Sequence, residues 1–254
     1  MAEAATLTLP TRRDEAWRYA DMDGVARLGV DALDAWQVIE VPAETSVARC
    51  MVVGSDAPEI HRFRVNLGEG AQAAFFVTNA GRDYTRVEIE VRLAKGAHFE
   101  FGGVTIGGGK VTREFVTQVI HAEPEATSNQ TIRAVHWNTG TGNFLGEIKV
   151  ARHAQKTHAG QDFKGLLLEA GASANAVPQL EIFADDVKCA HGATVGALDE
   201  AARFYMMARG LDPATAQRLL VQAFIGDAFV ALDDEAEHET LLNAALGALE
   251  GARL

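Results

Sequence analysis

A five-residue pattern, L-x-x-G-A, recurs three times in this chain of 254 residues and constrains its fold more than any other feature. The copies occupy residues 67–71, 93–97 and 168–172. The first two begin 26 residues apart, and the third begins 75 residues after the second, close to three such steps. A glycine turn that returns at a fixed interval is typical of coils stacked in a β-solenoid. A β-sandwich with evenly spaced turns accounts for the same spacing, so these residues alone leave both folds open.

Apolar and polar side chains alternate from about residue 61 onward. In residues 86–93 the apolar side chains of Val87, Ile89 and Val91 alternate with charged ones, and residues 61–67 follow the same pattern. A period of two predicts strands with one buried face. Turns containing glycine or asparagine then separate further predicted strands at 98–106, 111–120, 130–137 and 144–151.

Helical signals flank this β-rich body. Thr11, with Asp14 three residues later, predicts a short N-terminal helix through an approximate capping box. Asp199 predicts a helix through Arg209, and Asp212 followed by proline predicts the start of another, with an acidic amphipathic helix after it. We therefore expect a helical entry segment at 1–45, a β core at 46–196 and a helical segment at 197–254.

The charge balance bears on the partners and on the compartment. Thirty-five acidic residues against 23 basic ones give a formal charge of -12, which repels phosphate backbones and argues against a nucleic-acid partner. No apolar run approaches the roughly 20 residues that span a bilayer. The first residues lack the basic and apolar regions of a secretory signal. We expect a cytoplasmic protein with no membrane partner.

The glycine run Gly107-Gly108-Gly109-Lys110 has a superficial likeness to a phosphate-binding loop. A P-loop requires a glycine five positions before its last glycine and a Ser or Thr after the lysine. Val104 and Val111 occupy those two positions. The sequence therefore predicts no intrinsic ATPase.

The run Cys189-Ala190-His191 carries the most specific chemistry in the chain. Two residues apart on an extended segment, a thiol and an imidazole point to the same side and are suitable ligands for iron or copper(I). Only one other cysteine, Cys50, is present, and its apolar strand-like setting predicts a buried small side chain. A complete metal site would need ligands from another chain or from sulfide. Alternatively, His191 lowers the thiol pKa of Cys189 for redox or acyl chemistry.

The segment around this pair resembles the SufB/SufD family of iron–sulfur cluster assembly proteins, and within it the SufD branch. The resemblance rests on ADDVKC-x-HGATVG with the following LDE, FY and RG, and on an N-terminal P-x-R-x-x-E-x-WRY. It covers about residues 152–230 and some ten N-terminal residues. It implies a right-handed parallel β-helix (a mainly β solenoid) with short helical segments at both ends.

The resemblance also implies a role and a set of residues. The role is that of a non-catalytic scaffold in the SUF machinery, joined edge to edge with SufB and bound by the ATPase SufC at the C-terminal helices. A cluster is built transiently at the SufB–SufD interface, with no stably bound cofactor, and His191 is the first candidate ligand or proton-handling residue, with Cys189 second. We expect a homodimer when the chain is isolated. The residues expected on the SufC side are Asp199, Phe204, Tyr205, Leu219 and Phe224.

Two other functions remain compatible with the residues. One is an enzyme that uses Cys189 as nucleophile and His191 as base, although catalytic Cys/His pairs usually come from separate elements. The other is a β-solenoid interaction protein without metal chemistry.

Overall fold

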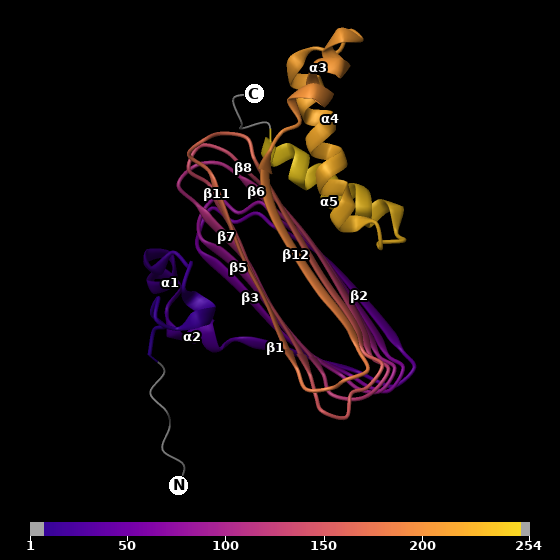
Figure 1. Cartoon of the computed structure of the whole chain (residues 1–254). Helices are drawn as coiled ribbons and strands as arrows, with labels where there is room; N and C mark the ends of the chain where they lie inside the picture. The colour runs from indigo at the N-terminus through magenta and orange to yellow at the C-terminus, as the bar shows by residue number, and fades with distance from the viewer. Residues whose placement is uncertain (1–7, 250–254) are drawn as a thin grey trace.

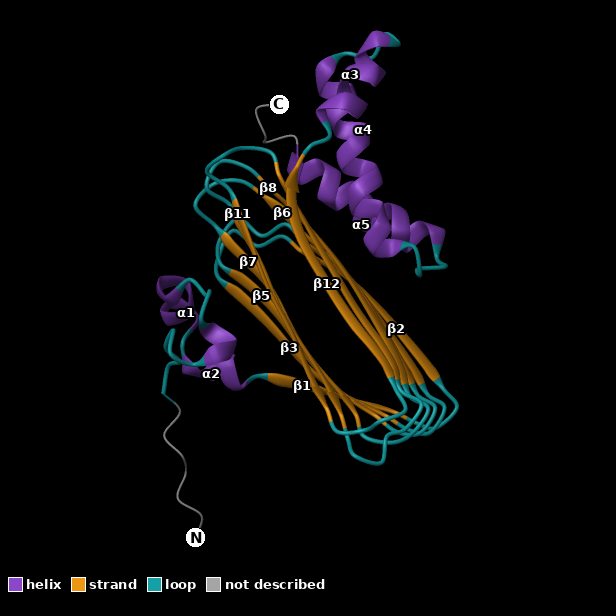
Figure 2. Ribbon diagram, viewed as in Figure 1, coloured by secondary structure: helices purple, strands orange, loops and turns teal. Residues whose placement is uncertain are grey.

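Twelve parallel strands wind into a solenoid of stacked coils, and each coil contributes one strand to each of two sheets (Figures 1 and 2). The computed structural model describes residues 8–249. We call the sheet of order β1-β3-β5-β7-β9-β11 sheet A, and that of order β2-β4-β6-β8-β10-β12 sheet B. This arrangement confirms the solenoid and excludes the β-sandwich. The strands are β1 (Trp36–Val41), β2 (Ser46–Val53), β3 (Glu59–Leu67), β4 (Gln72–Asn79), β5 (Thr85–Leu93), β6 (His98–Gly107), β7 (Thr112–His121), β8 (Thr127–His136), β9 (Thr141–Val150), β10 (His158–Leu167), β11 (Ser173–Ile182) and β12 (Lys188–Ala197).

Alternate residues of both sheets fill the space between them. In β5 the inward residues Val87, Ile89 and Val91 are almost wholly buried, as the alternation predicts. Phenylalanine rings contact one another between the sheets and between coils: the ring centroids of Phe63 and Phe75 lie 5.5 Å apart within one coil, and those of Phe75 and Phe99 lie 6.2 Å apart in successive coils. Burial of such rings is the main favourable term in the folding of the solenoid.

In each of the first five coils, the turn that leads from sheet A to sheet B contains a residue in the left-handed region. The first two L-x-x-G-A copies supply Gly70 and Gly96, with φ of 65° and 66°. The third copy, at 168–172, lies in the opposite turn, between β10 and β11, so it is not a further step of the same repeat. Its Gly171 is needed because a Cβ would collide with the carbonyl oxygen of Asn138. In the other three of these turns from sheet A to sheet B, the left-handed residue is Glu44, Glu125 or Lys156.

The N-terminal segment packs on the outer face of sheet A. The helix expected after Thr11 is only a three-residue 3-10 turn, η1 (Glu15–Trp17), and the helices begin later with α1 (Met22–Leu28) and α2 (Val30–Asp34). Trp17 is buried and stacks on the guanidinium of Arg86, 3.8 Å from its ring. Strand β1 lies within the 1–45 segment expected to be helical, so the solenoid begins before residue 46. Residues 1–7 lie outside the described part of the chain.

The C-terminal helices begin where their capping residues predict. They are α3 (Glu200–Ala208), α4 (Pro213–Gly226), the 3-10 turn η2 (Asp227–Phe229) and α5 (Glu235–Leu249), while residues 250–254 of the expected 197–254 segment lie outside the described residues. α4, η2 and α5 cover the outer face of sheet B, where Val221, Phe229 and Leu241 pack against Phe76 and Val104. α3 has no buried residue and projects beyond the sheets (Figure 1). Between residues 8 and 249, no helix has both the length and the apolar character to cross a membrane.

Two buried histidines make the stability of this fold depend on pH. Burial lowers the pKa of His136 to about 3, helped by the nearby Arg113, and burial lowers the pKa of His121 to about 4. His136 Nδ1 lies 2.9 Å from the carbonyl oxygen of Gly107, and its Nε2 lies 3.1 Å from Thr105 Oγ1. The neutral ring therefore donates at Nδ1 and accepts at Nε2. Both histidines stay neutral in the folded state at pH values where the unfolded chain is protonated.

We predict that His136→Gln flattens the pH dependence of the unfolding free energy. The folded pKa is lowered, so the stabilising contribution is complete above the unfolded pKa near 6.5 and is lost as the pH falls toward the folded value. At about 1.4 kcal/mol per pKa unit, His136 accounts for on the order of 3 kcal/mol between pH 7 and pH 4. Urea unfolding at the two pH values measures this. The control is His153→Gln at an exposed turn. If the unfolding free energy falls equally from pH 7 to pH 4 in both variants and in the wild type, His136 is not the source of the pH dependence.

Candidate functional site

The Cys-x-His pair lies in β12, the last strand of sheet B, at one end of the solenoid. β12 pairs with β10 only and β11 with β9 only, so each leaves its other edge without a strand partner among the described residues. An unpaired strand edge presents a row of backbone donors and acceptors to solvent. Figure 1 shows β11 and β12 at the near end of the stack, in orange. We call this the C-terminal end.

Strand register places both side chains on the inner face of this last coil. Cys189 pairs with Ala159 and His191 with Gln161, in line with the core residue Phe163 two positions further along β10. His191 is exposed, because no further coil of the solenoid covers it. Cys189 is half-buried and packs on an apolar cluster that includes Ile148 and Ala159. The expected same-side placement of the pair is therefore present.

Amide side chains continue the column of His191 into the core. Gln161 lies one coil behind His191 and Gln130 one coil further, and both are buried. Thr117 Oγ1 donates to Gln130 Oε1 at 2.5 Å. The amide atoms of Gln161 have no hydrogen-bond partner among the described residues. A buried amide without partners is costly, so Gln161 is available to hold a water or a polar group beside His191.

The chemistry of Cys189 is that of a protected thiol. Burial raises its pKa, and a backbone contact from Ala159 opposes this only partly. No hydrogen bond joins Cys189 to His191 in the described structure, so the imidazole does not activate the thiol there. Within residues 8–249, no three His, Cys, Asp or Glu side chains gather closely enough to hold a metal, and this includes the neighbouring Asp185 and Asp186. Cys189 and His191 alone therefore do not make up a metal site within the described residues.

The opposite end of the solenoid, formed by β1 and β2, differs in its inner face. There Arg49 lies over the ring of Phe63, 5.0 Å from the centroid, and its Nη1 donates to Gln37 Oε1 at 3.1 Å. An inward charge protects an open edge against association. At the C-terminal end the equivalent inner positions carry small side chains, Ala176, Cys189 and Ala193 among them. The C-terminal end can therefore accept a docking strand, whereas the inward charge of Arg49 disfavours docking at the other end.

A groove of about 580 Å³ crosses the outer face of sheet B next to the C-terminal end. Ala190, His191 and Gly192 line its edge, and Asp162 and Asp227 lie within it. Since the His191 side chain belongs to the inner face, its backbone rather than its imidazole borders this groove. The groove and the imidazole are thus on opposite sides of β12.

Sequence reasoning missed the residue that anchors the helical cover. Arg133 is buried on β8 and contacts Asp162 at 2.5 Å and also Asp227 of η2. Gly102 permits the close approach of η2, since a Cβ there would collide with the carbonyl oxygen of Ala228. Arg133 and Asp227 are 94 positions apart, so no local pattern signals their contact.

The five residues expected on the SufC side do not share one environment. Asp199 caps α3, accepting from the backbone N–H of Ala201 at 2.9 Å. Phe204 and Tyr205 are 72% and 57% exposed on α3, and Leu219 is exposed on α4. Phe224 of α4 instead packs against the apolar cluster between the helices and sheet B. We call the three exposed side chains of Phe204, Tyr205 and Leu219 the α3–α4 surface.

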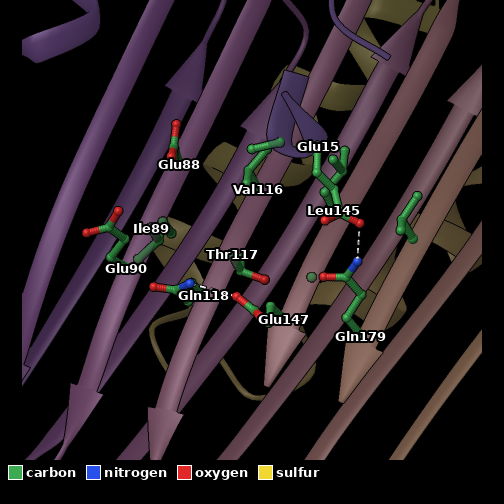
Figure 3. A pocket seen from close by; sticks show the side chains of 13 residues that line it. Glu15, Glu88, Ile89, Glu90, Val116, Thr117, Gln118, Leu145, Glu147 and Gln179 are labelled. Atoms are coloured by element: carbon green, nitrogen blue, oxygen red, sulfur yellow. Dashed lines mark hydrogen bonds between the residues drawn. The ribbon is translucent and has the colours of Figure 1, made fainter. Parts of the chain in front are cut away.

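A second groove, of about 260 Å³, lies on the outer face of sheet A beside η1 (Figure 3). Glu15, Glu88, Glu90 and Glu147 line it. Gln179 Nε2 donates to Glu15 Oε1 at 2.7 Å, which ties η1 to β11. The carboxylates do not form a metal-binding group by themselves, and we assign no chemistry to this groove.

These features define a β-solenoid with a cysteine and a histidine side chain on the inner face of one unpaired end. Residues 37–224, more than half of the chain, match the family model of the SUF system FeS cluster assembly SufBD core domain. The chain belongs to this family and is of the SufD type, which supports a role in iron–sulfur cluster assembly.

Curated relatives agree with the family over part of their length. The chain is 38% identical over 126 residues to the iron–sulfur cluster assembly protein SufD of Escherichia coli, covering 50% of this chain and 30% of that one. It is 41% identical over 114 residues to protein ABCI7, chloroplastic, of Arabidopsis thaliana, covering 44% and 24%. The SufD of Bacillus subtilis is 33% identical over 122 residues, covering 48% and 28%. The chain thus spans less than a third of these relatives' lengths, and two of them are named as assembly proteins.

We predict that Cys189 behaves as an unactivated thiol. In a Cys50→Ser background, the rate of alkylation by iodoacetamide should rise with an inflection above the ordinary thiol value of about 8.5, because burial disfavours the thiolate. His191→Ala should leave the inflection unchanged. An inflection below pH 8 that His191→Ala abolishes would instead support the cysteine enzyme.

Proposed function

We propose that this chain is a non-catalytic scaffold subunit of the SUF machinery that pairs with SufB through its C-terminal end and binds SufC through the α3–α4 surface. The nascent iron–sulfur cluster is the cargo built at the shared end, not a resident cofactor. The observation that carries this proposal is the exposure of His191 between two unpaired strand edges.

Edge pairing suits the chemistry of this end. A second solenoid that aligns its own terminal strands with β11 and β12 would satisfy their backbone groups and cover the small inner side chains. The same contact with a second copy gives the homodimer expected of the isolated chain. The Arg49 charge makes the other end a poor alternative.

His191 is the first candidate ligand because its imidazole is exposed at this end. Cys189 is second, since its half-buried thiol must lose a proton before it binds iron. Ligands from SufB and sulfide complete the coordination, as a half-site requires. The raised pKa of Cys189 and its lack of a bond to His191 argue against the cysteine enzyme.

We predict that two variants separate the partner surfaces. Ala193→Arg places a charge on the inner face of the last coil and should abolish co-purification with SufB while SufC binding is kept. Phe204→Asp on α3 should lose SufC and keep SufB. Each variant is the folding control of the other, and Val38→Arg at the opposite end controls for added charge. If Ala193→Arg still co-purifies with SufB, edge pairing is contradicted. If Phe204→Asp still co-purifies with SufC, the α3–α4 surface is not the SufC-binding site.

We predict that His191→Ala assembles with SufB and SufC but loses most of the visible cluster absorbance after anaerobic reconstitution. Cys189→Ser should have a smaller effect. The control is His153→Ala, an exposed histidine in the turn before β10. Undiminished absorbance in His191→Ala would leave a scaffold without metal chemistry of its own.

A further inference from the structure

Arg113 is a buried arginine that no carboxylate pairs with in the described part of the chain. It lies on the inner face of β7 with 3% of its surface exposed. Its Nε and Nη1 have no hydrogen-bond partner among the described residues, and no carboxylate contacts it there. A buried, unpaired guanidinium is strongly unfavourable, since neither water nor a protein acceptor compensates its charge.

The other two buried arginines show the arrangement that Arg113 lacks. Arg86 pairs with Glu88 at 3.1 Å and Glu114 at 3.3 Å, and Arg133 pairs with two aspartates. The two pKa values differ accordingly. Burial lowers the pKa of Arg86, but its carboxylates outweigh this and raise it, whereas burial alone lowers the pKa of Arg113 to about 10. His136 beside Arg113 is neutral and supplies no negative charge.

Arg113 lines a pocket of about 410 Å³ beside the glycine loop. Gly107 and Gly108 bring the loop against two donor side chains, since a Cβ on Gly107 would collide with the Arg113 guanidinium and one on Gly108 with Trp137 Nε1. Arg82 also lines the pocket. No acidic residue lies in its described lining, although the chain as a whole carries a charge of -12.

We infer that this pocket binds a small oxyanion of the phosphate class, with Arg113 as its buried counter-ion and the indole N–H of Trp137 as a second donor. A guanidinium presents a fork of N–H donors that matches phosphate oxygens. Ile106 and Val111 give the rest of the pocket an apolar wall, so the volume suits a phosphate carried on a small molecule as well as the free ion. The site is separate from His191 and independent of the proposed partners.

The test is phosphate-dependent stability of the full chain at constant ionic strength, with sodium chloride as the balancing salt so that screening does not change. Inorganic phosphate should raise the Tm of the wild type in a saturable way, because a ligand that binds only the folded state stabilises it. Arg113→Met should lose the shift while its Tm without phosphate equals or exceeds that of the wild type, since an apolar side chain removes the unpaired charge. Arg152→Met, at an exposed turn, should keep the shift.

Calorimetric titration and Arg113→Lys make the test independent of how well Arg113→Met folds. The lysine keeps the charge without the fork and should weaken phosphate binding about tenfold. A phosphorylated aromatic molecule that binds more tightly than the free ion would identify the carried form. No saturable shift in the wild type overturns the inference, as does a shift that Arg113→Met retains. Glu250 follows α5 directly and lies outside the described residues; a phosphate shift that appears only in Glu250→Gln would assign the counter-ion to that carboxylate and likewise overturn it.

Discussion

Hydrogen bonding between successive coils is the constraint on which the rest of the molecule depends. Within each sheet, a strand bonds to the strands of the coils before and after its own. The left-handed turn residues extend this ladder through the loops: Gly70 N–H donates to Lys95 O at 2.9 Å, and Lys156 N–H to Asp186 O at 2.6 Å. Such a ladder satisfies every coil except the first and the last. The two ends of the solenoid are therefore the places where its backbone ladder can accept a further strand.

The two ends answer this constraint differently, and the difference gives the fold a direction. Arg49 and Gln37 place a polar pair over the first phenylalanine of the core. The last coil carries alanines, Cys189 and His191 at the matching positions. His191 lies next to the buried column of Gln161 and Gln130 and also faces whatever molecule covers this end. Under the proposed function, docking and metal chemistry would therefore take place at the same surface.

Local signals predicted most of the fold, and tertiary contacts account for the rest. Alternation and turn signals located six strands, β3 and β5 to β9, but gave no range for β4, β10 and β11. The caps Asp199 and Asp212 located two helices, because a cap acts over a few residues. The third L-x-x-G-A gave a wrong repeat interval because glycine is required for different reasons in the two turns. Gly70 adopts a positive φ, whereas Gly171 makes room for the carbonyl oxygen of Asn138. At the site, spacing placed Cys189 and His191 on one face. The Arg133–Asp227 contact and the pocket at Arg113 arise only on folding.

Buried arginines join the irregular parts of this acidic chain to its sheets. Arg86 holds the N-terminal segment through Ala16 O at 2.8 Å and the ring of Trp17, while its charge is met by glutamates of β5 and β7. Arg133 holds η2 through Asp227 in the same manner. Arg113 occupies a comparable position between β7, the loop at Gly107 and the end of α5, but no acid among residues 8–249 lines the pocket beside it. An oxyanion in that place would link the glycine loop to the end of α5, in addition to the apolar contacts through which α5 packs on sheet B.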